Sequence, residues 1–185
     1  MRIITFFLFS IFLFAFKNDE EDFIIWREDI PLSWKDFKGK PERRFAAAST
    51  SYDILKSIHT TSDSSIVIDI KAVFLKKKSW RKKNWVNDLV LQHEQKHFDI
   101  VEVFARKLRK SVSENVQFFS KMVSLQIDSL YKENEKALDV YQDLYDNETD
   151  GSMNGDMQRK WNLAIGEELI LLNAYKTHTI KLKNH

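Results

Sequence analysis

Apolar and polar positions follow two different patterns along this chain. Between residues 23 and 74 apolar residues recur over short stretches near alternate positions, with Pro31 among the breaks. This pattern is typical of short β-strands and turns. Ala46–Leu55 is predicted as a strand of small and β-branched residues, and Ile66–Phe74 is the clearest strand in the chain.

From Asn84 onward the spacing becomes helical, because apolar residues and histidines recur three and four positions apart. The stripe of the first predicted helix is formed by Val86, Leu89, Val90, His93, His97, Val101, Phe104 and Leu108. A second helix is predicted at about Val116–Tyr145, followed by a breaker-rich loop over Asn147–Gly155. A third is predicted at about Asp156–Tyr175, with Asn154 as its N-cap.

Strands followed by helices predict an α+β fold. We expect an N-terminal antiparallel or mixed β-sheet packed on a C-terminal bundle of about three helices. The chain has 185 residues and no evident linker, so residues 23–180 are predicted to form a single domain. The absence of cysteine excludes a disulfide scaffold, a thiolate metal site and a thiol nucleophile.

The first 16 residues differ from the rest. Arg2 precedes an almost unbroken apolar run over residues 3–16, and the run ends at Lys17. A bilayer span needs about 20 apolar residues, so residues 1–16 are predicted to be a signal peptide, or else an uncleaved anchor. Either interpretation predicts export to the periplasm or the medium, and contact with a membrane only through this segment if at all.

Lysines and arginines cluster between the clearest strand and the first helix, over Lys76–Lys83. Such a run can bind phosphate backbones. No nucleic-acid motif accompanies it, and the net charge of the whole chain is only +2. We therefore expect a solvated loop and no nucleic-acid partner.

The sequence His93-Glu94-Gln95-Lys96-His97 is an H-E-x-x-H pattern within the first predicted helix. Residues four apart lie one above the other on a helix, so both imidazoles can reach one cation. Two neutral imidazole nitrogens suit Zn²⁺, and we predict one zinc ion per chain. Glu94 is then placed to act on a water at the metal without being a ligand itself.

A catalytic zinc site needs a third protein ligand. The densest source of oxygen ligands is the predicted end of the second helix, which returns to the first if the two helices pack antiparallel. We predict Glu148 as the ligand, with Asp146 and Asp150 as competitors. Asp99 and Glu102 are nearer in sequence, but they lie off the face of His97.

The sequence also resembles the bacterial family called domain of unknown function 922, which is described as predicted secreted zinc-dependent proteases. The resemblance covers nearly all of the chain after residue 22 and keeps its order. The matching segments are Trp34–Pro41, Ala46–Thr50, Ser79-Trp80, His93–Ile100, Ala105–Arg109, Tyr145–Thr149, and Gln158 with Trp161.

This resemblance implies a small zincin-like domain, with the H-E-x-x-H pattern on its active-site helix, that hydrolyses peptides or proteins. One position departs from the family pattern, in which a histidine commonly follows the Tyr-Asp-x-Glu-Thr segment after one residue. Here that position is Gly151. If the histidine is a ligand elsewhere in the family, a neighbouring carboxylate has to replace it in this chain.

The predicted chemistry is a Glu-assisted attack of zinc-bound water on a peptide carbonyl. Glu94 takes the proton of the water and passes it to the leaving amine. Tyr141 or Tyr145 is expected to help the metal stabilise the oxyanion. An extended substrate is expected to add to the edge of the sheet, and Ile66–Phe74 is the candidate edge strand.

The alternative interpretation is an exported zincin-like module that is catalytically inert. It would bind a partner, with a structural zinc ion or no metal. Loss of the family histidine and the many charged positions on the predicted helices favour it. Zinc binding with and without His93, followed by a peptide-cleavage assay, distinguishes the two interpretations.

Overall fold

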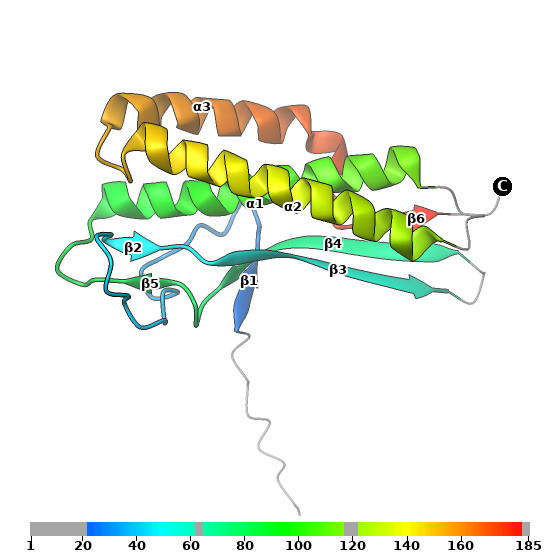
Figure 1. Cartoon of the computed structure of the whole chain (residues 1–185), viewed down its shortest axis with the longest axis horizontal. Coiled ribbons are helices and arrows are strands. Elements are labelled where there is room, and N and C mark those ends of the chain that lie inside the picture. The colour runs from blue at the N-terminus through cyan, green and yellow to red at the C-terminus, as the bar shows by residue number, and fades with distance from the viewer. Residues whose placement is uncertain (1–21, 62–64, 117–121, 183–185) are drawn as a thin grey trace, which may run out of the picture.

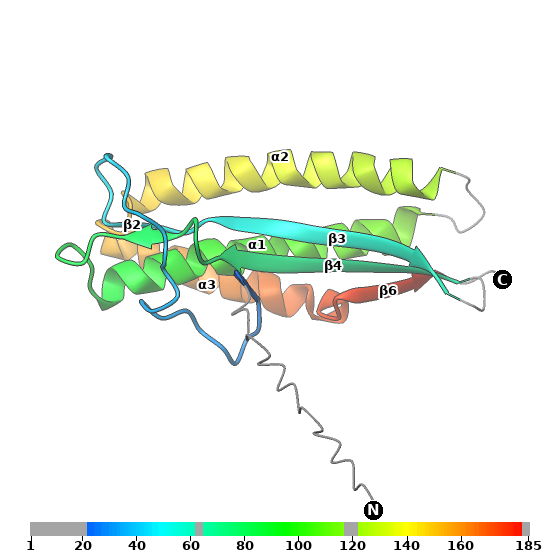
Figure 2. The same ribbon diagram turned by 90° about the horizontal axis from the view of Figure 1, so that it is seen from below.

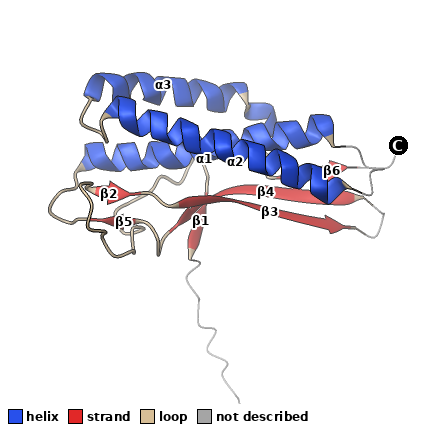
Figure 3. Cartoon of the chain, in the orientation of Figure 1, coloured by secondary structure: helices blue, strands red, loops and turns tan. Residues whose placement is uncertain are grey.

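The computed structural model describes residues 22–61, 65–116 and 122–182 and confirms the α+β class. The predicted signal segment, residues 1–16, lies outside these ranges. A β-sheet forms one layer and helices form the other, as Figure 3 shows. No helix in the described ranges has the length and apolar character needed to cross a membrane.

The main sheet is antiparallel throughout. Strand β4 (Ile66–Leu75) pairs with β3 (Tyr52–Thr60) on one side, and with β1 (Phe23–Ile25) and β6 (Thr179–Leu182) on the other. The prediction that Ile66–Phe74 is an edge strand is therefore wrong, because both of its sides are paired. Its buried side chains explain its strong apolar signal. Strand β3 forms one edge of the sheet, and β1 and β6 form the other.

A second, two-stranded sheet lies at one end of the molecule, where β2 (Ala48–Ser49) pairs with β5 (Trp80–Arg81). The predicted Ala46–Leu55 strand is thus divided between β2 and the start of β3. The break falls at Thr50 and Ser51, and the Ser51 amide there bonds to the Ser79 hydroxyl at 2.9 Å. This region positions the segment that contacts the H-E-x-x-H helix.

Helix α1 (Asp88–Asn115) lies across the sheet, and α2 (Val123–Thr149) returns beside it in the opposite direction (Figure 1). Helix α3 (Gly155–Leu171) reverses once more, and a short 3₁₀ turn, η1 (Asn173–Tyr175), leads to β6. Asn154 is the N-cap of α3, as predicted, because its side chain accepts from the Met157 amide at 3.2 Å. Strand β6 was not predicted.

The core lies between the sheet and α1. From β4 it contains Ile68, Ile70 and Phe74, which pack with Ile100 and Phe104 of α1. The predicted stripe of α1 is buried over most of its length, but Leu89 is 65% exposed. Leu89 lies in the first turn of α1, beyond the part of the helix that the sheet and α2 cover.

Helix α2 ends four residues later than predicted, at Thr149. Its last turn is closed by backbone in the left-handed region, with φ of 50° at Asp150 and 52° at Gly151. Glycine adopts this conformation without steric cost, and the Gly151 amide bonds to the Asp146 carbonyl at 3.1 Å. The position of the expected family histidine therefore terminates a helix in this chain.

Candidate metal centre

His93 and His97 lie on the same face of α1, as their spacing predicts, and both are buried. Their Nε2 atoms are 3.1 Å apart. Each Nε2 atom also lies 3.0 Å from Oδ1 of Asp146, which is in the last turn of α2. The three atoms form a nearly equilateral triangle drawn from two antiparallel helices.

The carboxylate that meets the imidazoles is thus Asp146, one of the predicted competitors, and not Glu148. The reason is the extension of α2 to Thr149, because residues two apart on a helix point in different directions. Glu148 instead accepts a hydrogen bond from the Trp161 indole at 2.8 Å. Asp150 lies beyond the helix, and it does not belong to the group of possible ligands.

Two glutamines orient the imidazoles from behind. Nδ1 of His93 lies 3.0 Å from Oε1 of Gln158, and Nδ1 of His97 lies 2.6 Å from Oε1 of Gln142. The Gln142 amide nitrogen donates to the His97 carbonyl at 2.9 Å, which fixes the amide with its oxygen toward the ring. Each Nδ1 atom is therefore placed to donate a proton, which leaves each Nε2 atom to bind a cation or, without one, to share a proton with Asp146.

Tyr145 packs against both imidazole rings. Its ring stacks on the His93 ring with a centroid distance of 4.7 Å, and it is fully buried. Its hydroxyl donates to the His93 carbonyl at 3.2 Å and accepts from Gln158 at 2.8 Å. Burial raises the pKa of this phenol far above its usual value, so it stays neutral.

The proposed help from a tyrosine to an oxyanion is not supported by this geometry. The Tyr145 hydroxyl is engaged with backbone and Gln158 on the far side of the His93 ring. The Tyr141 hydroxyl donates to Glu168 of α3. Both hydroxyls therefore hold helices together, while the ring of Tyr145 packs against both imidazoles.

The protonation of the cluster is coupled. Burial disfavours the charged form of His97, but the hydrogen bond to Asp146 and the negative charge of Glu94 outweigh it and raise the pKa of His97. Burial likewise opposes ionisation of Asp146. The hydrogen bonds from His93 and His97 outweigh that penalty and hold the pKa of Asp146 below its ordinary value. The site thus favours an ionised Asp146 carboxylate next to a positive charge, either a protonated imidazole or a cation.

The ligand atoms fit a divalent cation of the size of zinc. Two imidazole nitrogens and a carboxylate oxygen form a common zinc ligand set, and atoms about 2.0–2.1 Å from a tetrahedral ion lie about 3.3 Å from each other. The observed separations of 3.0–3.1 Å are close to this value. Three lone-pair-bearing atoms at this spacing repel one another unless protons or a cation lie between them.

The site is open on one side. The side chains of His93 and His97 are 4% and 11% exposed, whereas that of Asp146 is 55% exposed. Solvent and small molecules can therefore approach from the Asp146 side. This asymmetry suits a site with an open fourth position for water or substrate.

Glu94 follows His93 on α1 and is itself buried, at 4% exposure. Its Oε2 atom has no hydrogen-bond partner within the described ranges. The segment after β2 contacts the backbone of Glu94, because the Thr50 hydroxyl donates to the Glu94 carbonyl at 3.1 Å. The negative charge of Glu94 acts on His97, which places the carboxylate near the cluster. A buried carboxylate oxygen without a partner also occurs at Glu102 of the same helix, so this feature alone does not mark a site.

Asp99 and Glu102, the acids set aside in the sequence analysis, are not ligands. Asp99 accepts hydrogen bonds from Trp26, Gln95 and Lys96. Glu102 pairs with two arginines further along α1. Sequence reasoning missed Gln142 as an orienting residue, although it lies one helical turn before Asp146 and so faces the same side.

Comparison with known proteins adds no relative, since no family model matches the chain and no curated protein or solved structure matches it significantly.

Proposed function

We propose that this protein is an exported zinc-dependent peptidase of the H-E-x-x-H type, in which His93, His97 and Asp146 hold the metal. The observation that carries the proposal is the triangle formed by the two Nε2 atoms and Oδ1 of Asp146, with Glu94 buried beside it. The resemblance to the domain of unknown function 922 family and the apolar segment over residues 3–16 support the same proposal.

A zinc ion in such a set lowers the pKa of a water molecule in its open position toward about 7 and polarises a substrate carbonyl. The residues of the chain supply the rest. Glu94 accepts a proton from the attacking water and transfers it to the leaving amine. Gln142 and Gln158 hold the imidazoles so that both Nε2 atoms stay directed at one point.

Space for a substrate lies between β3 and α2. A cavity of about 200 Å³ is lined by Tyr52, Asp53, Ile54, Tyr131, Asn134, Glu135, Leu138 and Asp139. Asp139 precedes Asp146 by seven residues, which is about two helical turns or roughly 10 Å along α2. The cavity therefore lies about two turns of α2 from the ligand cluster.

The unpaired edge of β3 gives an extended peptide a place to bind. Helix α2 follows this edge of the sheet in Figure 2, and β3 pairs only with β4 among the described strands. Addition of a strand uses backbone hydrogen bonds and depends little on the substrate sequence. We propose that the peptide lies between β3 and α2 with its scissile bond at the Asp146 end.

The test is the substitution Glu94→Gln in the full chain. Zinc binding, measured by titration of the metal-free protein, should remain within a few fold of wild type, and cleavage of a peptide library should be lost. Asp146→Asn should weaken zinc binding, whereas Glu148→Gln should not. Equal cleavage by wild type and the Glu94 variant would rule out the general base.

The inert module of the alternative interpretation gives a different result in the same experiment. Wild type would then bind zinc, with dependence on His93, His97 and Asp146, and cleave no member of the library. A wild-type protein that binds no zinc would contradict the metal centre itself. The two failures are therefore distinguishable.

A further inference from the structure

Two segments distant in sequence form a strongly basic lobe at the end of the molecule where β2 and β5 lie. We define the basic lobe as residues 38–45 and 76–85. Together they contain ten lysines and arginines and only one acid, Glu42, so their net charge is +9 in a chain whose total is +2. The segments are joined by hydrogen bonds from the Gly39 amide to the Ser79 carbonyl, at 2.8 Å, and from Lys82 to Arg44.

Aromatic side chains protrude from the same lobe. Phe45 is 97% exposed and Trp85 is 51% exposed. Their rings meet edge to face with a centroid distance of 5.8 Å. Trp85 follows the lysine run directly, whereas Phe45 is distant from it in sequence, so only the fold brings the two rings together.

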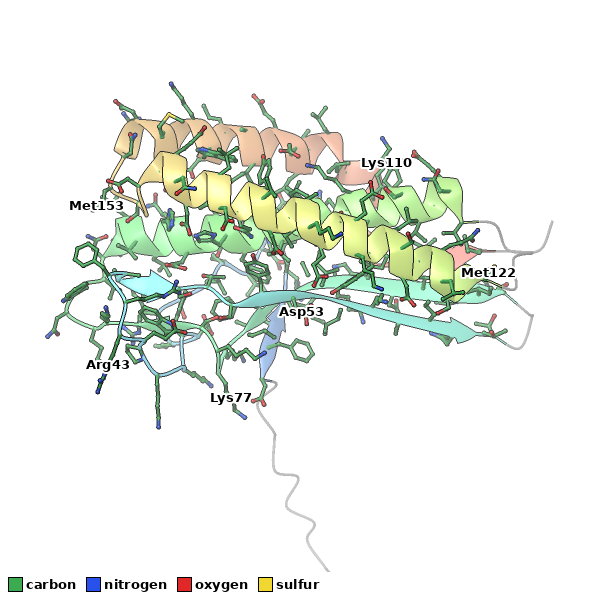
Figure 4. All side chains as sticks on the ribbon, viewed as in Figure 1. Arg43, Asp53, Lys77, Lys110, Met122 and Met153 are labelled. Carbon is green, nitrogen blue, oxygen red and sulfur yellow. The ribbon has the colours of Figure 1, made fainter. Side chains whose placement is uncertain are left out.

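Cations surround these rings. The Lys82 ammonium lies 4.4 Å from the centroid of the Trp85 ring, and the Arg44 guanidinium lies 5.2 Å from that of Trp80. Arg43 and Lys83 are exposed and form no ion pair or side-chain hydrogen bond within the described ranges. Figure 4 shows Arg43 and Lys77 projecting from the side of the molecule opposite α3.

We propose that the basic lobe docks on an anionic phospholipid surface, with Phe45 and Trp85 inserted at the headgroup level. Aromatic rings favour the membrane interface, and clustered lysines and arginines favour anionic headgroups. An exposed aromatic pair inside a basic field combines both preferences. The proposal is independent of the metal centre.

The path of the chain supports this choice of partner. The described part begins at Asp22, whose carboxylate pairs with Lys77 of the basic lobe at 2.6 Å. The apolar run over residues 3–16 ends six residues before Asp22. If the apolar run over residues 3–16 is held in a membrane, its short distance from Asp22 brings the basic lobe to the same membrane surface.

A single-stranded nucleic acid is the competing partner, since it also needs cations and aromatic rings. The geometry favours the membrane. The Phe45 and Trp85 rings are inclined by 65°, so they do not form two parallel platforms for successive bases. Trp80, the third ring of the lobe, is 1% exposed and cannot stack on a base.

The chain contains no cysteine, so one introduced cysteine can carry a polarity-sensitive fluorophore at a single position. Phe45→Cys places the label in the basic lobe, and Leu163→Cys places it on α3, where Leu163 is 70% exposed. Both labelled proteins are full-length and share the same N-terminal segment, so any contribution of that segment is the same in both. They are mixed with vesicles of phosphatidylcholine, with or without about one third phosphatidylglycerol.

We expect a blue shift of the label at position 45 on the anionic vesicles, and no shift on neutral vesicles or at position 163. Salt at about 0.5 M should remove it, because the Debye length is then only about 4 Å. Adding Arg43→Gln and Lys83→Gln should lower the vesicle partition coefficient, obtained by titrating lipid, about 25-fold, at about fivefold for each lost cation.

Equal responses at positions 45 and 163, or no dependence on anionic lipid, would overturn the proposal. A label at position 45 that responds to a single-stranded oligonucleotide and not to vesicles would overturn it in favour of nucleic acid. Circular dichroism of each labelled variant, compared with wild type, verifies that the fold is unchanged.

Discussion

Helix α1 contains two buried polar clusters, one in each half. In the second half, Glu102 accepts from Arg106 at 2.9 Å and from Arg109 at 2.6 Å, and all three side chains are buried. Both guanidiniums also donate to backbone carbonyls. Arg109 donates to those of Ile70 and Tyr175, and Arg106 donates to that of Leu169. In the first half, His93, His97 and Asp146 meet with no cationic side chain among them.

The difference separates a structural cluster from the proposed ligand site. Around Glu102, opposite charges and donors are supplied by the chain itself, and the cluster links α1 to β4, to α3 and to η1. Around His93, the chain supplies atoms with lone pairs and leaves the positive charge to come from protons or from a metal ion. Both clusters are polar, but they differ in the balance of donors and acceptors and in exposure, since the Asp146 side chain is 55% exposed and that of Glu102 only 1%.

The largest expected effect is on the structural cluster. Arg109→Met should lower the free energy of unfolding by about 3–5 kcal/mol, because it leaves the Glu102 carboxylate buried with one partner fewer. The loss should be the same with and without zinc, as measured by urea denaturation. Lys110→Met, at the next and exposed position, is the control and should cost little. Rescue of the Arg109 variant by zinc would contradict the separation of the two clusters.

The next effect is specific to the ligand site. Zinc at about 100 times its dissociation constant should stabilise wild type by about 2.7 kcal/mol, and His97→Ala should lose this gain. The measurement is thermal unfolding at several zinc concentrations. His59→Ala, on an exposed part of β3, should keep the gain. A zinc-dependent shift that survives in the His97 variant would place the metal elsewhere.

A smaller effect concerns the orienting amides. Gln142→Leu removes the hydrogen bond to Nδ1 of His97, and we expect zinc affinity to fall about 10–100-fold. Competition with a chromophoric chelator measures the change. Gln92→Leu, on an exposed position of α1, should leave the affinity as it is. If both variants bind zinc like wild type, then packing alone orients the ring.

The smallest effect is on the metal-free protein. The raised pKa of His97 adds stability that is complete below its ordinary value of 6.5 and is lost as pH rises through the raised pKa. The lowered pKa of Asp146 adds stability above its ordinary value of 3.8 that is lost as pH falls. Between these limits we expect a shallow maximum in chemical denaturation, and His97→Ala should abolish it. A flat profile in wild type would show that the cluster is uncoupled from folding.

Much of the fold follows from the sequence because the apolar spacing is strong where burial is one-sided. The helical stripe from Val90 to Leu108 and the run from Ile66 are examples. Strand β6 could not be predicted, because its four residues alternate between exposed and half-buried positions and depend on β4 for pairing. The edge position of β3 depends on which strands flank β4, and spacing within a strand does not encode that order.

The candidate metal centre likewise has one part that the sequence predicts and one part that it does not. His93, Glu94 and His97 follow from a spacing that is local to one helix. The choice of Asp146 over Glu148 depends on where α2 ends, since an added turn rotates one acid toward α1 and the other toward Trp161. The left-handed backbone at Asp150 and Gly151 determines that end, and helix ends are the least certain part of any sequence-based prediction.

The glutamines behind the imidazoles have a further consequence. In many zinc sites a carboxylate stands at that place and makes the ring a stronger electron donor. Here both supports are neutral amides, and Asp146 would be the single anionic group on a bound ion. An ion held this way stays electron-poor, which makes it a stronger Lewis acid but also easier to lose to a chelator. Occupancy of the site would then follow the supply of free metal where the protein resides.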